Sequence, residues 1–328
     1  MYGPLLACLS LATLLAVDTL ASLCIAGLWP ALEAAAARLR AASRARLLFL
    51  LRTAPALLAL VAVLALLIPS YVIHEPRDTE EAVSAGLGLL AALSLIGIAC
   101  ALRRGAAAWI ATRRLLRTWQ KHARPVTLAD SGLPAFRIRH RFPVVGIVHF
   151  SRPRLFIAEQ VFLSLGREEL AAVLAHERGH LAAGDSFKRA LLAVCRDVLG
   201  MLPRGRHLER LWSAAAEEAA DDYAARTGPA AALDLASALV KLARLAPAGS
   251  ALRMPAGAHL VVGDPGSITA RVVRLTRMGP GGASGSCAAA ARVILGGVSV
   301  LLSCLVLAAA GPRIYAAVHA ALEVLVSL

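Results

Sequence analysis

Two histidines and a glutamate stand at the spacing His176-Glu177-Arg178-Gly179-His180, inside a segment whose apolar residues recur at helical intervals from 170 to 182. Because four residues make about one helical turn, both imidazoles project from one face and can bind a single tetrahedral Zn²⁺. Glu177 directly follows the first histidine and can reach a water at the metal as general base. The pattern therefore predicts a catalytic zinc site with His176 and His180 as ligands.

A second helical segment, residues 211–224, lies about forty residues downstream and is rich in acidic groups. It contains two overlapping Glu-x-x-x-Asp pairs, Glu217 with Asp221 and Glu218 with Asp222. In each pair the two carboxylates lie one turn apart on the same helix face. Either pair can supply a third ligand, and the spacing alone leaves both frames open.

A helix with H-E-x-x-H followed by a helix with this acidic spacing resembles the gluzincin membrane peptidases, either the BlaR/MecR-type sensor-transducers or the HtpX and Ste24 group. The resemblance covers residues 151–224. It implies one Zn²⁺ per chain, with the first Glu of the acidic pair as third ligand and the Asp orienting a ligand histidine. Matching Ala220-Asp221 to the family's Ala-Asp assigns Glu217 as ligand and Asp221 as the orienting group. The frame of Glu218 with Asp222 stays the alternative.

Further features resemble the sensor-transducers in particular: Ser151-Arg-Pro before the zinc helix, Met201-Leu-Pro-Arg before the second helix, and the membrane topology described below. Two features depart from that family. Arg178-Gly179 stands where small or apolar residues are usual, and Gly179 weakens the helix by about 1 kcal/mol relative to Ala. Only residues 311–328 follow the last apolar segment, so we expect no external penicillin-binding sensor domain.

The turn Gly184-Asp185-Ser186 separates the zinc helix from the next helix. Asp185 fits two roles: a helix N-cap, which we favour, or a carboxylate that orients a ligand histidine. Tyr223, Arg226, His259 and Arg271 are candidates for stabilising an oxyanion, and the sequence does not choose among them.

Hydrophobicity predicts a mainly α-helical membrane protein. The chain is 58% hydrophobic with a mean hydropathy of +0.67 and only 5% aromatic residues, which favours long aliphatic helices over barrel strands. Four apolar segments are long enough to cross a bilayer: 5–28, 54–73, 83–102 and 293–310. Residues 136–141 and 144–150 have strand-like patterns and predict a small sheet, one edge of which can bind an extended peptide.

We therefore expect three transmembrane helices and a basic juxtamembrane helix in residues 1–123, and a zincin-like α+β peptidase domain in 124–285. The fourth transmembrane helix and a short tail would occupy 286–328.

Charge predicts the orientation. The net charge is +14, and basic residues gather in the first loop (Arg38, Arg40, Arg44, Arg46) and after the third span, whereas the loop 75–81 is mainly acidic. By the positive-inside rule the N-terminus lies outside and the zinc domain is cytoplasmic, in a bacterial inner (plasma) membrane. Since anionic lipid accounts for most of this basic charge, we expect no direct nucleic-acid binding.

These observations together predict a membrane-embedded zinc metalloendopeptidase that hydrolyses a cytoplasmic or membrane protein, such as a transcriptional repressor in a signalling pathway. Quality control of membrane proteins is the alternative. A non-catalytic receptor or transporter would instead use Asp18, an acidic residue in the first span that we interpret as a packing group within the helix bundle.

Overall fold

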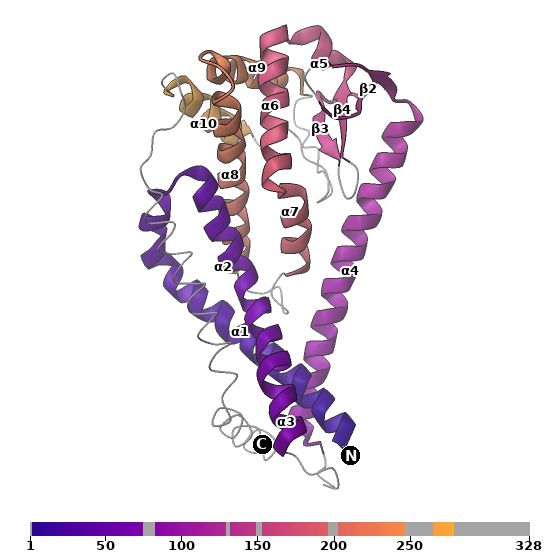
Figure 1. Ribbon diagram of the computed structural model, residues 1–328, viewed down its shortest axis with the longest axis vertical. Coiled ribbons are helices and arrows are strands. Elements are labelled where there is room, and N and C mark those ends of the chain that lie inside the picture. Colours follow the sequence, from indigo (N-terminus) through magenta and orange to yellow (C-terminus); the bar gives the residue numbers. More distant parts are fainter. Residues whose placement is uncertain are drawn as a thin grey trace.

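The computed structural model describes residues 2–74, 83–128, 132–148, 153–195, 203–246 and 265–278, and it is mostly helical with one small sheet (Figure 1). The helices are α1 (Tyr2–Ala37), α2 (Ala41–Val61), η1 (Ala62–Leu67), α3 (Ile68–His74), α4 (Ala85–Lys121), α5 (Glu159–Ser164), α6 (Arg167–Ala183), α7 (Asp185–Val194), α8 (Pro203–Ala225), α9 (Ala231–Leu245) and α10 (Pro265–Thr276). The strands are β1 (Arg124–Val126), β2 (Ala135–Ile138), β3 (Val145–Val148) and β4 (Arg154–Ala158). The predicted fourth span, 293–310, lies outside the described residues.

Three helical stretches in the described part of the chain are long and apolar enough to cross a membrane: Gly3–Ala37, Ala41–His74 and Ala85–Lys121. Each contains nearly all of one predicted span, so the structure has a candidate membrane helix at each of these three places. Asp18 and Arg52 are buried among these helices, only 8% and 5% exposed. Their burial agrees with the interpretation of Asp18 as a packing group.

The second stretch is not one regular α-helix. A π-helical segment, η1, joins α2 to α3, and the N–H of Ile68 donates to the carbonyl of Val63, five residues back. Pro69 follows directly. A proline has no N–H and its ring collides with the carbonyl four residues earlier, so a wider turn before Pro69 relieves the collision.

The predicted third span and the basic segment after it form a single helix, α4. The Ser84 hydroxyl caps its start by accepting from the N–H of Leu87 at 3.2 Å. Near its other end Trp119 is buried, and its ring lies 5.3 Å from that of Phe156 in β4. Helix α4 therefore connects the membrane part directly to the sheet.

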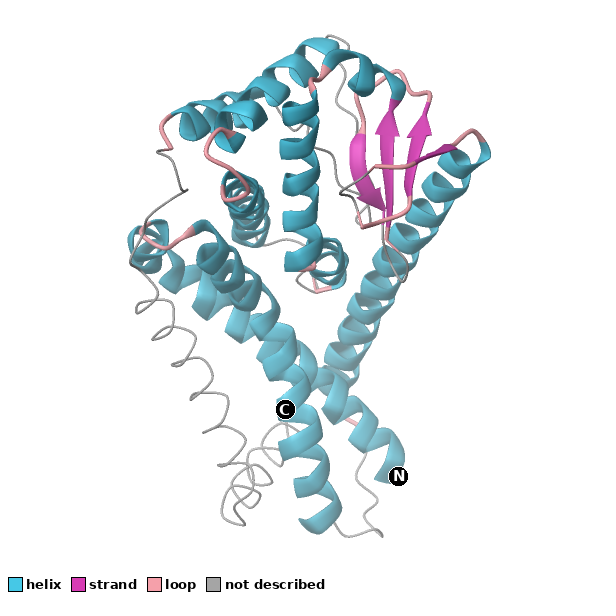
Figure 2. Cartoon of the chain, turned by 45° about the horizontal axis from the view of Figure 1, so that its top comes forward, coloured by secondary structure: helices cyan, strands magenta, loops and turns pink. Residues whose placement is uncertain are grey.

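The sheet has the strand order β1-β2-β4-β3, with β2 and β4 parallel and the other two pairs antiparallel. Figure 2 shows it between α6 and the end of α4. The small predicted sheet is confirmed, although β2 and β3 are shorter than expected. Strand β1 was not predicted, because three residues that include Pro125 give no readable alternation. The main core lies between sheet, α6 and α9, around Phe156, Val173 and Leu239.

A second apolar cluster joins the membrane helices to the rest of the molecule. Trp29 of α1 and Leu48 of α2 pack in it with Trp212 and Ala216 of α8. The sequence had placed Arg44 and Arg46 in a loop, but the loop is confined to residues 38–40 and both arginines lie in α2. The alanine-rich start of α2 favours helix, so α2 begins at Ala41 and this first part packs against α8.

Candidate metal centre

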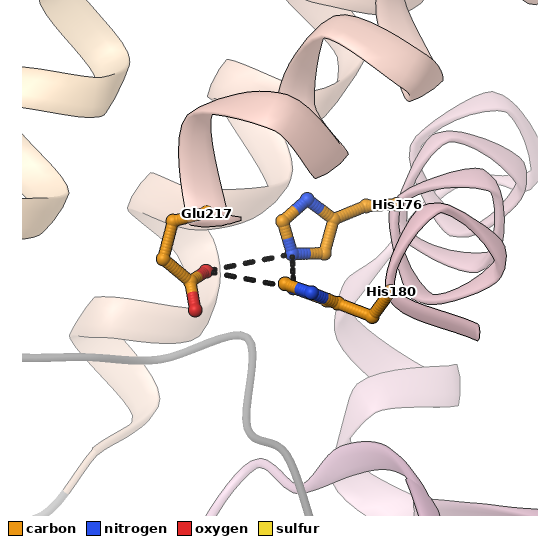
Figure 3. Close-up of side chains that lie close together, drawn as sticks. All are labelled: His176, His180 and Glu217. Atoms are coloured by element: carbon orange, nitrogen blue, oxygen red, sulfur yellow. Dashed lines mark hydrogen bonds and ion pairs between the residues drawn. The ribbon is translucent and has the colours of Figure 1, made fainter. Parts of the chain in front are cut away.

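Three side chains from two helices converge on one point (Figure 3). His176 and His180 on α6 place their Nε2 atoms 3.2 Å apart. From α8, Oε2 of Glu217 lies 3.6 Å from Nε2 of His176 and 3.8 Å from Nε2 of His180. Among the described residues these form a group of donor atoms, all within 4.8 Å of one another, that could hold one metal ion.

Helix α6 is held firmly at both ends. At its start the carboxylate of Glu169 accepts from the N–H of Gly166 at 2.8 Å, and it also binds Ser237 and Lys241 of α9 at 2.6 and 2.8 Å. At its end Gly184 adopts a φ of 69°, a left-handed conformation that favours glycine. These contacts fix the position of α6 and therefore the positions of His176 and His180.

Gly179 permits the close approach of the two helices. A Cβ at this position would lie 3.0 Å from the Cα of Ala220 and 3.1 Å from the Cβ of Tyr223, both on α8. In the sequence Gly179 was notable only for its low helix propensity. In the structure its missing side chain allows α8 to pack closely against α6. Without this contact, Glu217 would stand farther from His176 and His180.

A carboxylate lies against the second ring nitrogen of each histidine. Asp221 Oδ1 is 2.9 Å from Nδ1 of His176, and Asp185 Oδ2 is 2.8 Å from Nδ1 of His180. A carboxylate there favours a proton on Nδ1 and leaves the Nε2 lone pair for a metal. Such partners fix both the tautomer and the orientation of the rings.

The favoured reading of Asp185 as an N-cap is wrong. Gly184 is the residue before the first turn of α7, and Asp185 is already helical, with its side chain turned to His180. Only Gly184, in its left-handed conformation, separates the end of α6 at Ala183 from Asp185. The sequence showed the turn but not the direction in which the carboxylate points.

The two acidic frames of α8 face different partners. Glu217 and Asp221 lie beside the histidines, whereas Glu218 lies 2.6 Å from Arg44 and Asp222 pairs with Arg274. The geometry therefore brings the first frame, and not the second, to the candidate metal centre.

Glu177 is almost completely buried at 1% exposure. Its Oε2 accepts from the N–H of Ile147 in β3 at 3.3 Å, and its Oε1 is buried without a hydrogen bond to any described residue. Burial raises its pKa to about 7. A buried carboxylate oxygen without a partner, next in sequence to a metal donor, is typical of a group that meets a water or substrate.

Comparison with protein families bears on this site directly. Residues 144–280 match the model of peptidase family M48, a segment that begins just before β3 and contains α6, α8 and α10. This part of the chain belongs to peptidase family M48. The resemblance inferred from the sequence is thereby confirmed, and the protein is a zinc metallopeptidase associated with a membrane. A comparison with curated proteins finds no match.

The donor set at this centre fits zinc. Two imidazole nitrogens and one carboxylate oxygen are one of the common ligand sets of a catalytic zinc, which keeps a fourth position open. In a tetrahedral site with bonds of about 2.1 Å, ligand atoms lie about 3.4 Å apart. The separations of 3.2, 3.6 and 3.8 Å between the donors are close to that value.

Arg271 of α10 is a member of the M48 site whose role the sequence did not reveal. It had been one of several candidates for binding an oxyanion, but its guanidinium binds Asp221 at 2.9 and 2.6 Å and lies 3.2 Å from Glu217. Only its position on an amphipathic helix was visible in the sequence. Of the other candidates, Arg226 lies over the ring of Tyr223, and His259 lies outside the described residues.

These contacts set the charges of the groups around the histidines. Burial opposes ionisation of Asp221, but hydrogen bonds with His176 and Arg271 outweigh it and lower the pKa to about 2. Burial likewise opposes a charge on His180, but hydrogen bonds to Asp185 and Glu217 raise its pKa to about 9 in the metal-free protein. For His176 burial dominates and lowers the pKa.

Proposed function

We propose that this M48 peptidase hydrolyses peptide bonds at a zinc ion held by His176, His180 and Glu217, with Glu177 as general base. The observation that carries the proposal is the convergence of three donor side chains beside a buried glutamate, one oxygen of which has no hydrogen bond to any described residue. A bound zinc ion would polarise the scissile carbonyl and lower the pKa of water.

Glu177 would move the proton. Because the N–H of Ile147 holds Oε2 at 3.3 Å, Oε1 is the atom left to accept a proton from the attacking water. The protonated carboxyl then donates that proton to the leaving amine. Asp221 and Asp185 keep the rings of His176 and His180 in place throughout, since each carboxylate holds an Nδ1.

Strand β3 supports binding of an extended peptide. It is an edge strand of the sheet, and the N–H of Ile147 points away from β4 toward Glu177. A substrate segment laid along this edge would pass the general base directly. Strand addition of this kind uses main-chain hydrogen bonds and therefore tolerates many sequences.

The distribution of basic residues supports a substrate on the cytoplasmic side. We propose that residues 124–285 form a cytoplasmic peptidase domain in the bacterial inner membrane, with the N-terminus outside, because basic residues flank the helices on the domain side. The likeness to sensor-transducer peptidases favours a cytoplasmic transcriptional repressor as substrate. A misfolded membrane protein is the alternative, and a gene for a small repressor beside this one would favour signalling.

The test separates chemistry from metal binding. Wild-type protein in detergent should hold one zinc per chain and cleave β-casein, whereas Glu177→Gln should keep the zinc and lose at least about 10²-fold in rate. His180→Ala should lose both zinc and activity, because two remaining protein ligands seldom hold a catalytic zinc.

Glu168→Gln is the matched control, since Glu168 lies exposed on the same helix. Its zinc content and rate should equal those of the wild type. Cleavage at the wild-type rate by zinc-loaded Glu177→Gln would refute the proposed general base.

A further inference from the structure

Glu218 and Asp222 form the second acidic pair of α8. They follow Glu217 and Asp221 directly in the sequence and therefore face another side of the helix. Two arginines from other helices bind this pair. Arg44 of α2 donates to Oε2 of Glu218 at 2.6 Å. Arg274 of α10 pairs with Asp222 and lies 3.7 Å from the same Glu218 oxygen. The pair is therefore engaged on both sides.

These ion pairs are partly shielded from water. The side chains of Arg44 and Glu218 are 22% and 29% exposed, and those of Arg274 and Asp222 are 26% and 11% exposed. A shielded pair with several charges is stronger than an isolated surface pair. Arg274 also donates to the main-chain carbonyl of Glu218 at 3.4 Å, so it contacts the backbone of α8 as well as its side chains.

The clamp, defined as Arg44, Glu218, Asp222 and Arg274, connects a membrane helix to the turn of α8 that bears Glu217. Arg44 stands on the helix that continues into the second candidate membrane span, Ala41–His74. Farther along the same contact, the apolar cluster of Leu48 with Trp212 and Ala216 packs α2 against α8. Helix α8, which carries Glu217, is thus packed against a candidate membrane helix.

We propose that this clamp fixes the rotation of α8 and that Arg44 is a positioning residue for Glu217, through which the membrane helix α2 helps to set the zinc site. This inference rests on the proposed role of Glu217 as a zinc ligand. Consecutive residues of a helix stand about 100° apart around its axis, so holding Glu218 from two sides holds Glu217 as well.

Small rotations are enough to matter. A roll of about 10° moves an atom about 6 Å from the helix axis by about 1 Å. Zinc sites tolerate deviations of about 0.2 Å in ligand distance. Arg271 restrains Glu217 directly at 3.2 Å, so loss of the clamp should weaken the site and not abolish it.

The experiment measures zinc affinity of the full-length protein in detergent, by competition with a chelator. Arg44→Ala and Glu218→Gln should each raise the zinc dissociation constant about threefold to tenfold. The double variant should lose no more than Glu218→Gln alone, because Glu218→Gln already removes the ion pair with Arg44. Arg44→Lys should restore part of the affinity.

The visible spectrum of the Co²⁺-loaded protein gives a readout that depends on ligand geometry. It should change in Arg44→Ala and Glu218→Gln and stay unchanged in Arg46→Ala, because Arg46 lies exposed on the same helix. Glu218→Gln keeps the shape of the side chain, so its result decides if Arg44→Ala fails to fold.

The two proposals fail in different ways. If the wild type binds no zinc, the proposed function is wrong. If the wild type binds one zinc while both clamp variants keep its affinity and its Co²⁺ spectrum, the clamp proposal alone is overturned.

Discussion

Replacing Gly179 by alanine tests whether the close approach of α6 and α8 builds the metal centre. The new Cβ would lie 3.0 Å from the Cα of Ala220, whereas carbon atoms in contact stay about 3.5–4.0 Å apart. The obstructing atom belongs to the backbone, so the helices must separate by about 0.5–1 Å. Glu217 would move away from His176 and His180 by a similar amount.

Two effects on stability oppose each other in Gly179→Ala. Alanine favours the helix by about 1 kcal/mol, and overpacking costs about 1–3 kcal/mol. We therefore expect a net loss of about 0–2 kcal/mol. The shift of the donors exceeds the tolerance of about 0.2 Å in zinc distances, so zinc affinity should fall about 10- to 100-fold.

The assays are thermal unfolding of the metal-free protein and chelator competition for zinc. Gly27→Ala is the matched control, because a Cβ at that helical position meets nothing within 4 Å. It should leave zinc affinity unchanged. If Gly179→Ala is more stable than the wild type and binds zinc equally well, the reasoning from close approach is refuted.

Two further predictions concern stability and topology. Burial opposes ionisation of Glu169, but hydrogen bonds from Lys241 and Ser237 outweigh it and lower its pKa. Glu169→Gln should thus cost about 1–2 kcal/mol at pH 7. Because a lowered pKa stabilises the fold only while the group is ionised, melting curves of variant and wild type should converge as the pH falls below about 4.3; a constant gap would contradict this. A reporter fused after Gly282 should behave as cytoplasmic and one within 75–81 as external, and the reverse result would invert the proposed topology.

The sequence predicted the elements that follow from local periodicity. Runs of about twenty apolar residues need no partner to be recognised, and the spacing of His176 and His180 fixes one helix face by itself. The three described spans, the zinc helix and the small sheet could be predicted for this reason. Strand β1 could not, because its pairing with β2 depends on where α4 ends.

The contacts between helices could not be predicted. Glu217 and Glu218 stand about 100° apart around α8, and only the packing of α8 against α6 and α2 decides which of them faces the histidines. Arg271 is 50 residues from Asp221, and no local pattern links the two. Gly179 shows the same limit, since its unfavourable helix propensity is visible in the sequence but the backbone of Ala220 opposite it is not.

Helix α4 runs without interruption from its apolar half to the sheet. Because it is continuous, a change in the tilt of its apolar half moves the end that contacts the sheet. The residues from Arg103 to Lys121 rise about 27 Å, so a change of 10° in tilt displaces the far end of the helix by about 5 Å. Tilt adjusts to the thickness of the bilayer. Trp119 at that end packs on Phe156 of β4, and the neighbouring β3 supplies the N–H that holds Glu177. We therefore expect the activity of this enzyme to depend on the thickness of the lipid bilayer or detergent micelle around it.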